Sequence, residues 1–154
     1  MEKDKIAAFN LARPNDHNFL GAISDKIEKV KIYRNQKFGV SSTINKNFIK
    51  KEDIIDDDYI QTTTLNIVLE NSPFKEKKID LLNIDTEGND FKVVKSLNFD
   101  VYKPSIIIIE THLKKIDEII KSEIYLFLIR RKYILKSWNV YSLIFIKESY
   151  YENN

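Results

Sequence analysis

The sequence contains no cysteine, so disulfide bonds, cysteine-ligated metal sites and thiol catalysis are excluded. Its longest uninterrupted aliphatic run, residues 106–109, is far shorter than the roughly 20 residues that a helix needs to span a bilayer. Neither sign of charge dominates, because the net charge is +2 and lysines are interleaved with acids. No arginine stripe of the kind that follows a phosphate backbone is present. We therefore expect a soluble, cytoplasmic chain with neither a nucleic-acid nor a membrane partner.

The length and composition indicate one globular domain. A chain of 154 residues can bury a real hydrophobic core but is too short for two ordinary domains. Hydrophobic residues make up 43% and charged residues 31%, as in typical soluble proteins. The first 16 residues are charged and lack a long apolar segment, so we expect neither a signal peptide nor an anchor there. Residues 1–154 are taken as a single domain.

Hydrophobic periodicity predicts alternating strands and helices along the chain. The predicted strands are residues 18–24, 29–34, 79–85 and 105–110, followed by a closing antiparallel hairpin of 133–138 and 141–147. The predicted helices are residues 65–70, 89–97 and 116–132. Residues 38–48 are expected to form a loop, and the strongly charged residues 50–59 to be solvated.

The pattern of the central strands predicts an α/β fold. Residues 79–85 and 105–110 are almost continuously apolar, as expected of parallel strands covered by helices on both faces. Strands that alternate with helices are typical of a layered α/β sheet with right-handed crossovers. In open sheets of this kind, ligands bind at the carboxyl ends of the strands. Asp85 and Glu110 each end one of these strands.

Acidic residues gather at these two predicted strand ends. Asp85, Glu87 and Glu110 should lie close together if the strands are neighbours, and His112 follows two residues after Glu110. Gly88 allows a sharp turn or the close approach of a ligand before the next helix. Helix capping also accounts for acids before a helix, and an isolated histidine is often an exposed loop residue. The three carboxylates could also hold a hard divalent ion, although the spacing does not require a metal.

Residues 79–110, IDLLNIDTEGNDFKVVKSLNFDVYKPSIIIIE, resemble the central signature of the FkbM-type methyltransferases. That signature has a strand ending in Asp-x-Glu-Gly, a helix, and a proline-preceded strand ending in Glu, often followed by His. The matching residues are Asp85, Glu87, Gly88, Pro104, Glu110 and His112. The resemblance extends over nearly the whole chain, although Arg131 stands where a glycine is usual.

The resemblance implies a Rossmann-like class I methyltransferase sheet and S-adenosylmethionine as cofactor. The implied reaction is O-methylation of a small-molecule, sugar or glycan hydroxyl. By resemblance, Asp85 would lie below the transferred methyl group and Glu87 would contact the charged end of the cofactor or the acceptor. Glu110 and His112 would orient or deprotonate the acceptor, with His112 as the base, and Ser24 would contact the adenine.

Two elements of the family pattern have no counterpart in the sequence. These are a first strand with a glycine-bearing loop, and a second strand ending in an acid that holds the ribose. The domain is therefore expected to be N-terminally truncated, with residues 79–85 as an apolar sheet edge. Such an edge implies a complementing N-terminal chain, a homo-oligomer, or a rearranged sheet that covers it. Alternatives to an active enzyme are a catalytically incomplete scaffold that binds a partner chain, and carbohydrate or metal binding without catalysis.

Overall fold

The computed structural model describes residues 3–34, 42–54 and 56–152. Its strands are β1 (Ala22–Ile23), β2 (Lys29–Arg34), β3 (Ser42–Thr43), β4 (Asp56–Thr63), β5 (Leu81–Ile84), β6 (Ile106–Glu110), β7 (Tyr133–Asn139) and β8 (Ser142–Lys147). Its α-helices are α1 (Lys3–Ala12), α2 (Leu65–Glu70), α3 (Asp90–Lys95), α4 (Ile116–Ile119), α5 (Glu123–Ile129) and α6 (Glu148–Tyr151). Two short 3₁₀ helices, η1 (Lys46–Phe48) and η2 (Lys51–Asp53), precede β4.

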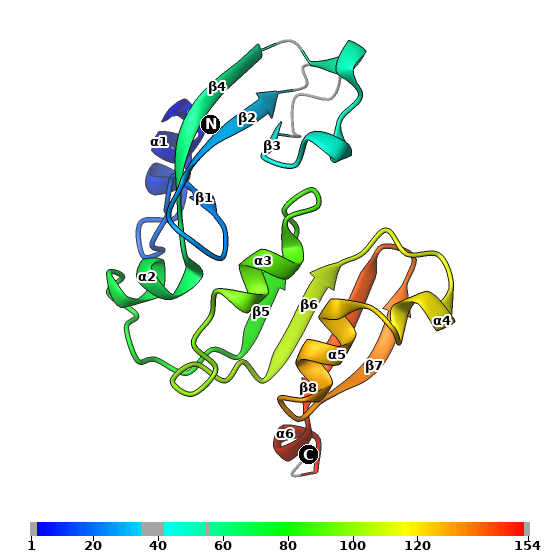
Figure 1. Ribbon diagram of the computed structural model, residues 1–154. Coiled ribbons are helices and arrows are strands. Elements are labelled where there is room, and N and C mark those ends of the chain that lie inside the picture. Colours follow the sequence, from blue (N-terminus) through cyan, green and yellow to red (C-terminus); the bar gives the residue numbers. More distant parts are fainter. Residues whose placement is uncertain (1–2, 35–41, 55, 153–154) are drawn as a thin grey trace.

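The described strands form two sheets, which Figure 1 shows one above the other. The first has the order β1-β4-β2-β3, with β1 parallel to β4 and the remaining pairs antiparallel. The second has the order β5-β6-β8-β7, with β5 parallel to β6 and both later pairs antiparallel. The mixed α/β class and the closing hairpin of β7 and β8 are confirmed. A Rossmann-like class I sheet without its first strands stays a prediction.

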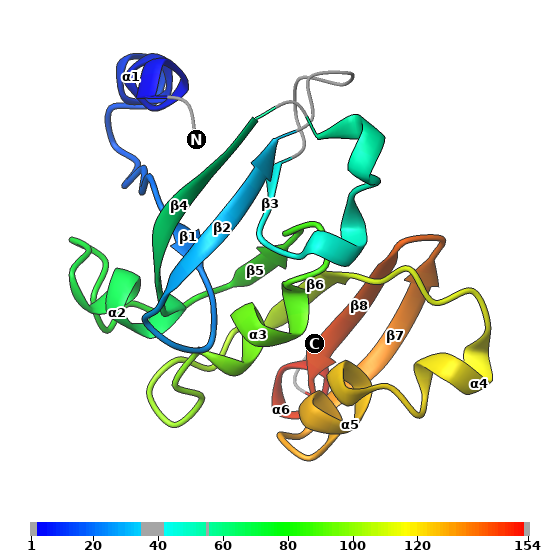
Figure 2. The ribbon, with the colours of Figure 1, turned by 45° about the horizontal axis from the view of Figure 1, so that its top comes forward.

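The hydrophobic core lies on one face of the second sheet. Alternate residues of β6 and β8 are fully buried, and the helices α3 and α5 cover them on the same side (Figures 1 and 2). The core residues are Ile84, Val93, Val94, Ile107, Ile109, Ile119, Leu128, Tyr133, Leu143 and Phe145. By contrast, Ile32 is the only large apolar side chain of the described first-sheet strands that is buried. The second sheet therefore supplies most of the hydrophobic stabilisation.

The opposite face of the second sheet is incompletely covered, contrary to the expectation of helices on both faces. Ile106, Ile108, Ile144 and Ile146 are only half-buried on this face, and Leu81 is 53% exposed. The cause lies in the topology. The crossover from β5 to β6 and the crossover from β6 to β7 run in the same direction along the sheet. Because crossovers between parallel strands have one handedness, α3 and α5 lie on the same face.

Strand β5 forms one edge of the second sheet, as expected for residues 79–85. It pairs with β6 on one side, and no strand among the described residues pairs with its other side. The edge is short, since β5 has four residues. Leu81 is exposed at the start of this edge.

The predicted helix over residues 116–132 is wrong, because the structure has two short helices, α4 and α5. Ser122 separates them. Its hydroxyl donates a hydrogen bond to the Ile119 carbonyl (2.7 Å) and accepts one from the Tyr125 amide (3.2 Å). One side chain therefore ends the first helix and caps the second.

Other boundaries also differ from the prediction. Only Ala22–Ile23 of the predicted strand 18–24 pairs in a sheet. The charged residues 50–59 contain η2 and the start of β4, because the β4 backbone pairs with β2 from Asp56 to Gln61. Residues 42–48 of the predicted loop contain β3 and η1, whereas residues 38–41 lie outside the described part. The sequence pattern did not predict α1 or α6.

No helix within the described ranges has the length and apolar character required to cross a membrane.

Candidate active site

The parallel register of β5 and β6 brings the two acidic strand ends together. Ile84 is opposite Ile109, so the chain leaves the sheet at Asp85 next to Glu110. The negative charges of Asp85 and Glu87 both act on the Glu110 carboxyl group and raise its pKa. The expectation that Asp85, Glu87 and Glu110 lie near one another is confirmed.

The turn between β5 and α3 is organised by Asp90, a residue that the sequence pattern did not single out. Its carboxylate is 5% exposed and accepts hydrogen bonds from the Thr86 amide (2.9 Å), the Thr86 hydroxyl (3.0 Å) and the Gly88 amide (3.1 Å). Glu87 and Gly88 both adopt positive φ values, +53° and +89°. Three bonds to a buried carboxylate hold this left-handed stretch in place.

The first sheet contributes a second layer of contacts to the same turn. The Thr43 hydroxyl donates a hydrogen bond to the Glu87 carbonyl, and the Asn45 side-chain amide donates one to the Gly88 carbonyl, both at 2.9 Å. The Phe48 ring lies directly against Gly88, and a Cβ at position 88 would overlap that ring. Gly88 is therefore required both for its positive φ and for the close approach of Phe48.

Glu110 has the most perturbed carboxyl group of the cluster. Its side chain is 16% exposed, and its Oε2 atom is buried without a hydrogen-bond donor. Burial, as the largest cause, raises the pKa of Glu110 to about 7 together with the negative charges of Asp85, Asp90 and Glu87 and a hydrogen bond to Asp85. The Glu110 carboxyl group therefore exchanges its proton close to neutral pH.

His112 lies beside Glu110 and between two aromatic rings. Its Nε2 atom is 3.3 Å from Glu110 Oε1, and its side chain is 44% exposed. The centroid of the imidazole lies 4.6 Å from that of Phe48 and 5.6 Å from that of Tyr141. This packing orients the imidazole while leaving part of it open to a ligand.

Ser24, the residue assigned by resemblance to the adenine, belongs to the first sheet. It is buried at the end of β1, where its amide donates to the Thr63 carbonyl (2.8 Å) and its hydroxyl faces Asp25 at 3.5 Å. The Asn89 side chain bonds the neighbouring Ile23 carbonyl at 2.7 Å and so ties this strand to the start of α3. Its role at the adenine stays a prediction.

Helix capping does not explain the acids at the end of β5. The N-cap residue of α3 is Asn89, whose side chain makes no capping hydrogen bond. Asp90 binds backwards to the turn, and neither Asp85 nor Glu87 caps the helix. Within the described ranges, no group of three His, Asp or Glu residues is arranged to hold a metal ion.

Residues 3–135 match the methyltransferase FkbM domain. The chain belongs to the FkbM methyltransferase family. Searches of curated proteins and of solved structures found no match to it. In this FkbM domain, the two strand ends of the family signature are adjacent and carry the acidic cluster, which accords with a methyltransferase.

Sequence reasoning missed the residues that hold the site together. Asp90 had a local signal, because an Asp two residues after a glycine is a common turn former. Thr43, Asn45 and Phe48 had none, since they lie about 40 residues before the turn that they contact.

Proposed function

We propose that this FkbM domain transfers a methyl group from S-adenosylmethionine to a hydroxyl group of a sugar, glycan or natural product. The observation that carries the proposal is the pair formed by Glu110 and His112, a largely buried carboxyl with a pKa of about 7 at 3.3 Å from an imidazole. This pair lies beside Asp85 and Glu87 at the carboxyl ends of two parallel strands, where open α/β sheets bind ligands.

The acidic cluster suits the charged end of the cofactor. When bound, S-adenosylmethionine supplies a methyl group on a positively charged sulfonium. Asp85 and Glu87 would hold that end of the molecule, because their carboxylates favour the sulfonium and amino charges. The buried Glu110 Oε2 atom, which lacks a donor, is an acceptor for an ammonium or hydroxyl proton.

His112 would act as the general base. When Glu110 is ionised, its Oε1 accepts the His112 Nε2–H, and Nδ1 is left to take the proton of the acceptor hydroxyl. The O–C bond then forms as the S–C bond breaks, and the proton ends on Nδ1. The negative charge of Glu110 stabilises the resulting imidazolium. A base of this kind contributes about 10²- to 10⁴-fold to the rate.

This mechanism predicts a rate that increases with pH through about 7, because Glu110 must lose its proton before it can accept the Nε2–H. At lower pH, Glu110 is protonated and its carboxyl group can no longer accept the Nε2–H of His112, so the base is lost.

Titration calorimetry with S-adenosylmethionine tests the binding half of the proposal. We expect saturable binding by the unmodified chain and at least about tenfold weaker binding by Asp85→Asn. Transfer of a radiolabelled methyl group to a panel of methyl glycosides tests the catalytic half. His112→Ala should retain cofactor binding and lose transfer. Full turnover by His112→Ala would exclude it as the base.

A second candidate function is a catalytically incomplete scaffold that binds a partner chain or another copy of itself. The half-buried isoleucines on the open face of the second sheet and the free edge of β5 favour this alternative. Calorimetry separates the two candidates. An absence of cofactor binding by the isolated chain, with binding restored on addition of a complementing N-terminal chain, would identify a split enzyme.

A further inference from the structure

A pocket of about 440 Å³ lies at the end of the second sheet opposite to the acidic site. Three segments form it: the residues before β5, the residues before β6, and the end of β8 with the start of α6. The lining residues are Glu76, Lys77, Lys78, Ile79, Val101, Tyr102, Lys103, Ser105, Lys147, Ser149 and Tyr150. Its volume falls in the range of small-molecule sites.

The lining is strongly basic. It contains four lysines and one acid, Glu76, and it contains no arginine. Of the lysines, Lys78 forms an ion pair with the exposed Asp80, with 3.0 Å between Nζ and Oδ1. Such an exposed ion pair breaks and forms readily in solvent and contributes little to stability. A neighbouring pocket that shares Lys103 and Lys147 also has excess positive charge, but its lining includes three acids, Asp100, Glu148 and Glu152.

Lys147, Ser105 and Tyr102 are lining residues whose side-chain polar groups have no partner within the described ranges. Lys147 is half-buried, yet within the described ranges no carboxylate lies within ion-pair distance of its amino group. Ser105 is 4% exposed, and its hydroxyl has no hydrogen-bond partner in the same part of the chain. The two residues are joined by a hydrogen bond from the Lys147 amide to the Ser105 carbonyl (2.9 Å). The Lys147 ammonium and the Ser105 hydroxyl are both available to an acceptor in the pocket, and the hydroxyl of Tyr102, another lining residue, is buried without a hydrogen-bond partner in the described part of the chain.

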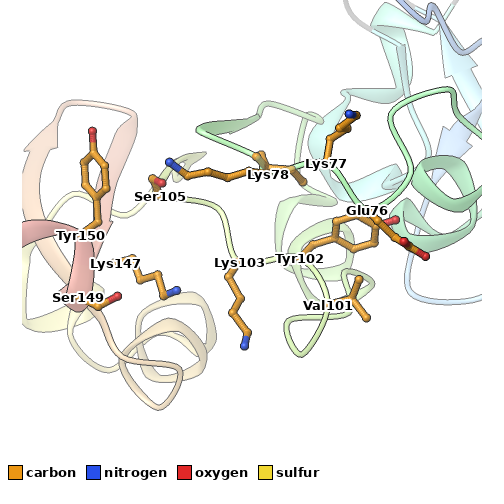
Figure 3. A pocket seen from close by; sticks show the side chains of 11 residues that line it. Glu76, Lys77, Lys78, Val101, Tyr102, Lys103, Ser105, Lys147, Ser149 and Tyr150 are labelled. Atoms are coloured by element: carbon orange, nitrogen blue, oxygen red, sulfur yellow. The ribbon is translucent and has the colours of Figure 1, made fainter.

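Figure 3 shows how these groups are arranged. The side chains of Lys78 and Lys147 extend on the same side of the pocket as Ser105, and that of Lys103 continues the basic lining, whereas the Lys77 amino group points away. Lysine ammoniums act as compact point charges, which suit a multiply charged tetrahedral anion better than a flat carboxylate. The serine hydroxyl would add a directed hydrogen bond to one oxygen.

We propose that this pocket is a binding site for a phosphate-class oxyanion, such as the phosphate group of a phosphorylated small molecule. Lys147 and Ser105 would contact the anion directly, and Lys78 and Lys103 would supply the surrounding positive charge. The site is separate from the acidic cluster and does not depend on the methyltransferase proposal, since it lies at the opposite end of the strands.

Titration with inorganic pyrophosphate and orthophosphate, followed by amide NMR of the full chain at constant ionic strength, tests this proposal. We expect saturable shifts at the amides of Lys103, Ser105 and residues 147–149, with pyrophosphate binding more tightly. Lys147→Gln and Ser105→Ala should each weaken binding about tenfold. Removal of the unpartnered Ser105 hydroxyl should leave the fold intact, and Lys147→Gln provides the second variant if it does not.

The matched control is Lys121→Gln, which removes the same charge from an exposed lysine outside the pocket. Equal weakening by this control, shifts that do not saturate, or unchanged affinity in both pocket variants would overturn the proposal. Sedimentation with vesicles that contain phosphatidic acid distinguishes two sources of the anion. Sedimentation that Lys147→Gln abolishes assigns the site to a lipid headgroup, and saturable phosphate binding without sedimentation assigns it to a soluble ligand.

Discussion

Glu110 couples the acidic site to the stability of the fold. Its pKa in the folded chain is about 7, whereas the reference value is 4.5. Below pH 4.5 the carboxyl is protonated in both the folded and the unfolded states, so its burial carries no charge penalty. As the pH rises through about 7, the folded state must hold an ionised carboxylate beside three other acids. The contribution of Glu110 to stability is therefore lost as the pH rises through this range.

Glu110→Gln should consequently increase the free energy of unfolding at pH 8 by on the order of 2 kcal/mol. Denaturant unfolding at pH 5 and pH 8 checks this expectation. The variant should also show a smaller fall in stability between the two pH values than the unmodified chain does. Glu118→Gln, which changes an acid that is 42% exposed, should leave that pH dependence unchanged. An equally steep fall in the Glu110 variant would contradict the assigned role.

Gly88→Ala should destabilise the chain by about 2–3 kcal/mol, because it adds a methyl group against the Phe48 ring at a φ of +89°. Thermal or urea unfolding measures this loss. Addition of Phe48→Ala should remove the clash with the new methyl group. The double variant should therefore lose less free energy of unfolding than the sum of the losses in the two single variants. Gly21→Ala provides a control, since its added methyl would likewise meet a phenylalanine ring, Phe19, but at a position without a positive φ.

At the scale of single residues, the sequence predicted which acidic side chains lie together but not which contacts hold them in place. Asp85 and Glu110 could be placed together because each ends a predicted strand and consecutive strands of an α/β sheet are usually neighbours, with ligands at their carboxyl ends. The pKa of Glu110 could not be predicted, since it depends on burial and on the distances to Asp85, Asp90 and Glu87. The contact of Phe48 with Gly88 depends on the packing of the first sheet, which no local pattern contains.

Among the elements, the junction between α4 and α5 depends on one serine. Isoleucine and leucine recur at helical spacing on both sides of it, so the periodicity of residues 116–132 continues across the break. Periodicity reports which residues face the core and does not report whether the backbone is continuous. The two hydrogen bonds of Ser122 decide that question.

Ser122→Ala should reduce the free energy of unfolding by about 1 kcal/mol, because the first turn of α5 loses its side-chain cap. Chemical denaturation provides the measurement. Ser122→Asp keeps the acceptor for the Tyr125 amide and should recover most of the loss. A Ser122→Ala variant as stable as the unmodified chain would show that the packing of α5 alone fixes the break.

At the scale of the whole molecule, the open face of the second sheet favours association. Ile106 and Ile146 are cross-strand partners on this face, and both are half-buried. Contiguous apolar surface of this kind marks an interaction site or a tendency to aggregate. We propose that a partner chain or a second copy of this chain covers it.

Ile106→Thr combined with Ile146→Thr should lower the apparent mass at high protein concentration, as measured by light scattering. Each substitution should cost only about 1 kcal/mol of stability, because these side chains are partly solvated. Ile107→Thr changes the adjacent residue on the buried face and should cost about 3 kcal/mol. Unchanged association in the double variant would exclude this face as the contact.

The fold class was predictable because it follows from short-range alternation of strands and helices. The division into two sheets was harder to predict from the sequence. The charged start of β4 does not have the composition of a strand, and its pairing with β2 spans more than 20 residues of sequence. To predict the incompletely covered face, both the strand order and the crossover direction must be known, and only the structure supplied both.

The two sheets also determine the order in which the chain can fold as it is synthesised. The first sheet lies within residues 22–63 and the second within 81–147, so the first leaves the ribosome before any strand of the second exists. The first sheet has little hydrophobic core of its own. The Thr43 and Asn45 side chains can form their hydrogen bonds with Glu87 and Gly88 only after these two residues have left the ribosome. Phe145, at the centre of the core, lies in β8, the last strand of the second sheet along the chain. Folding of the two sheets therefore awaits the synthesis of β8, and a nascent chain that stalls before it exposes unpaired strands.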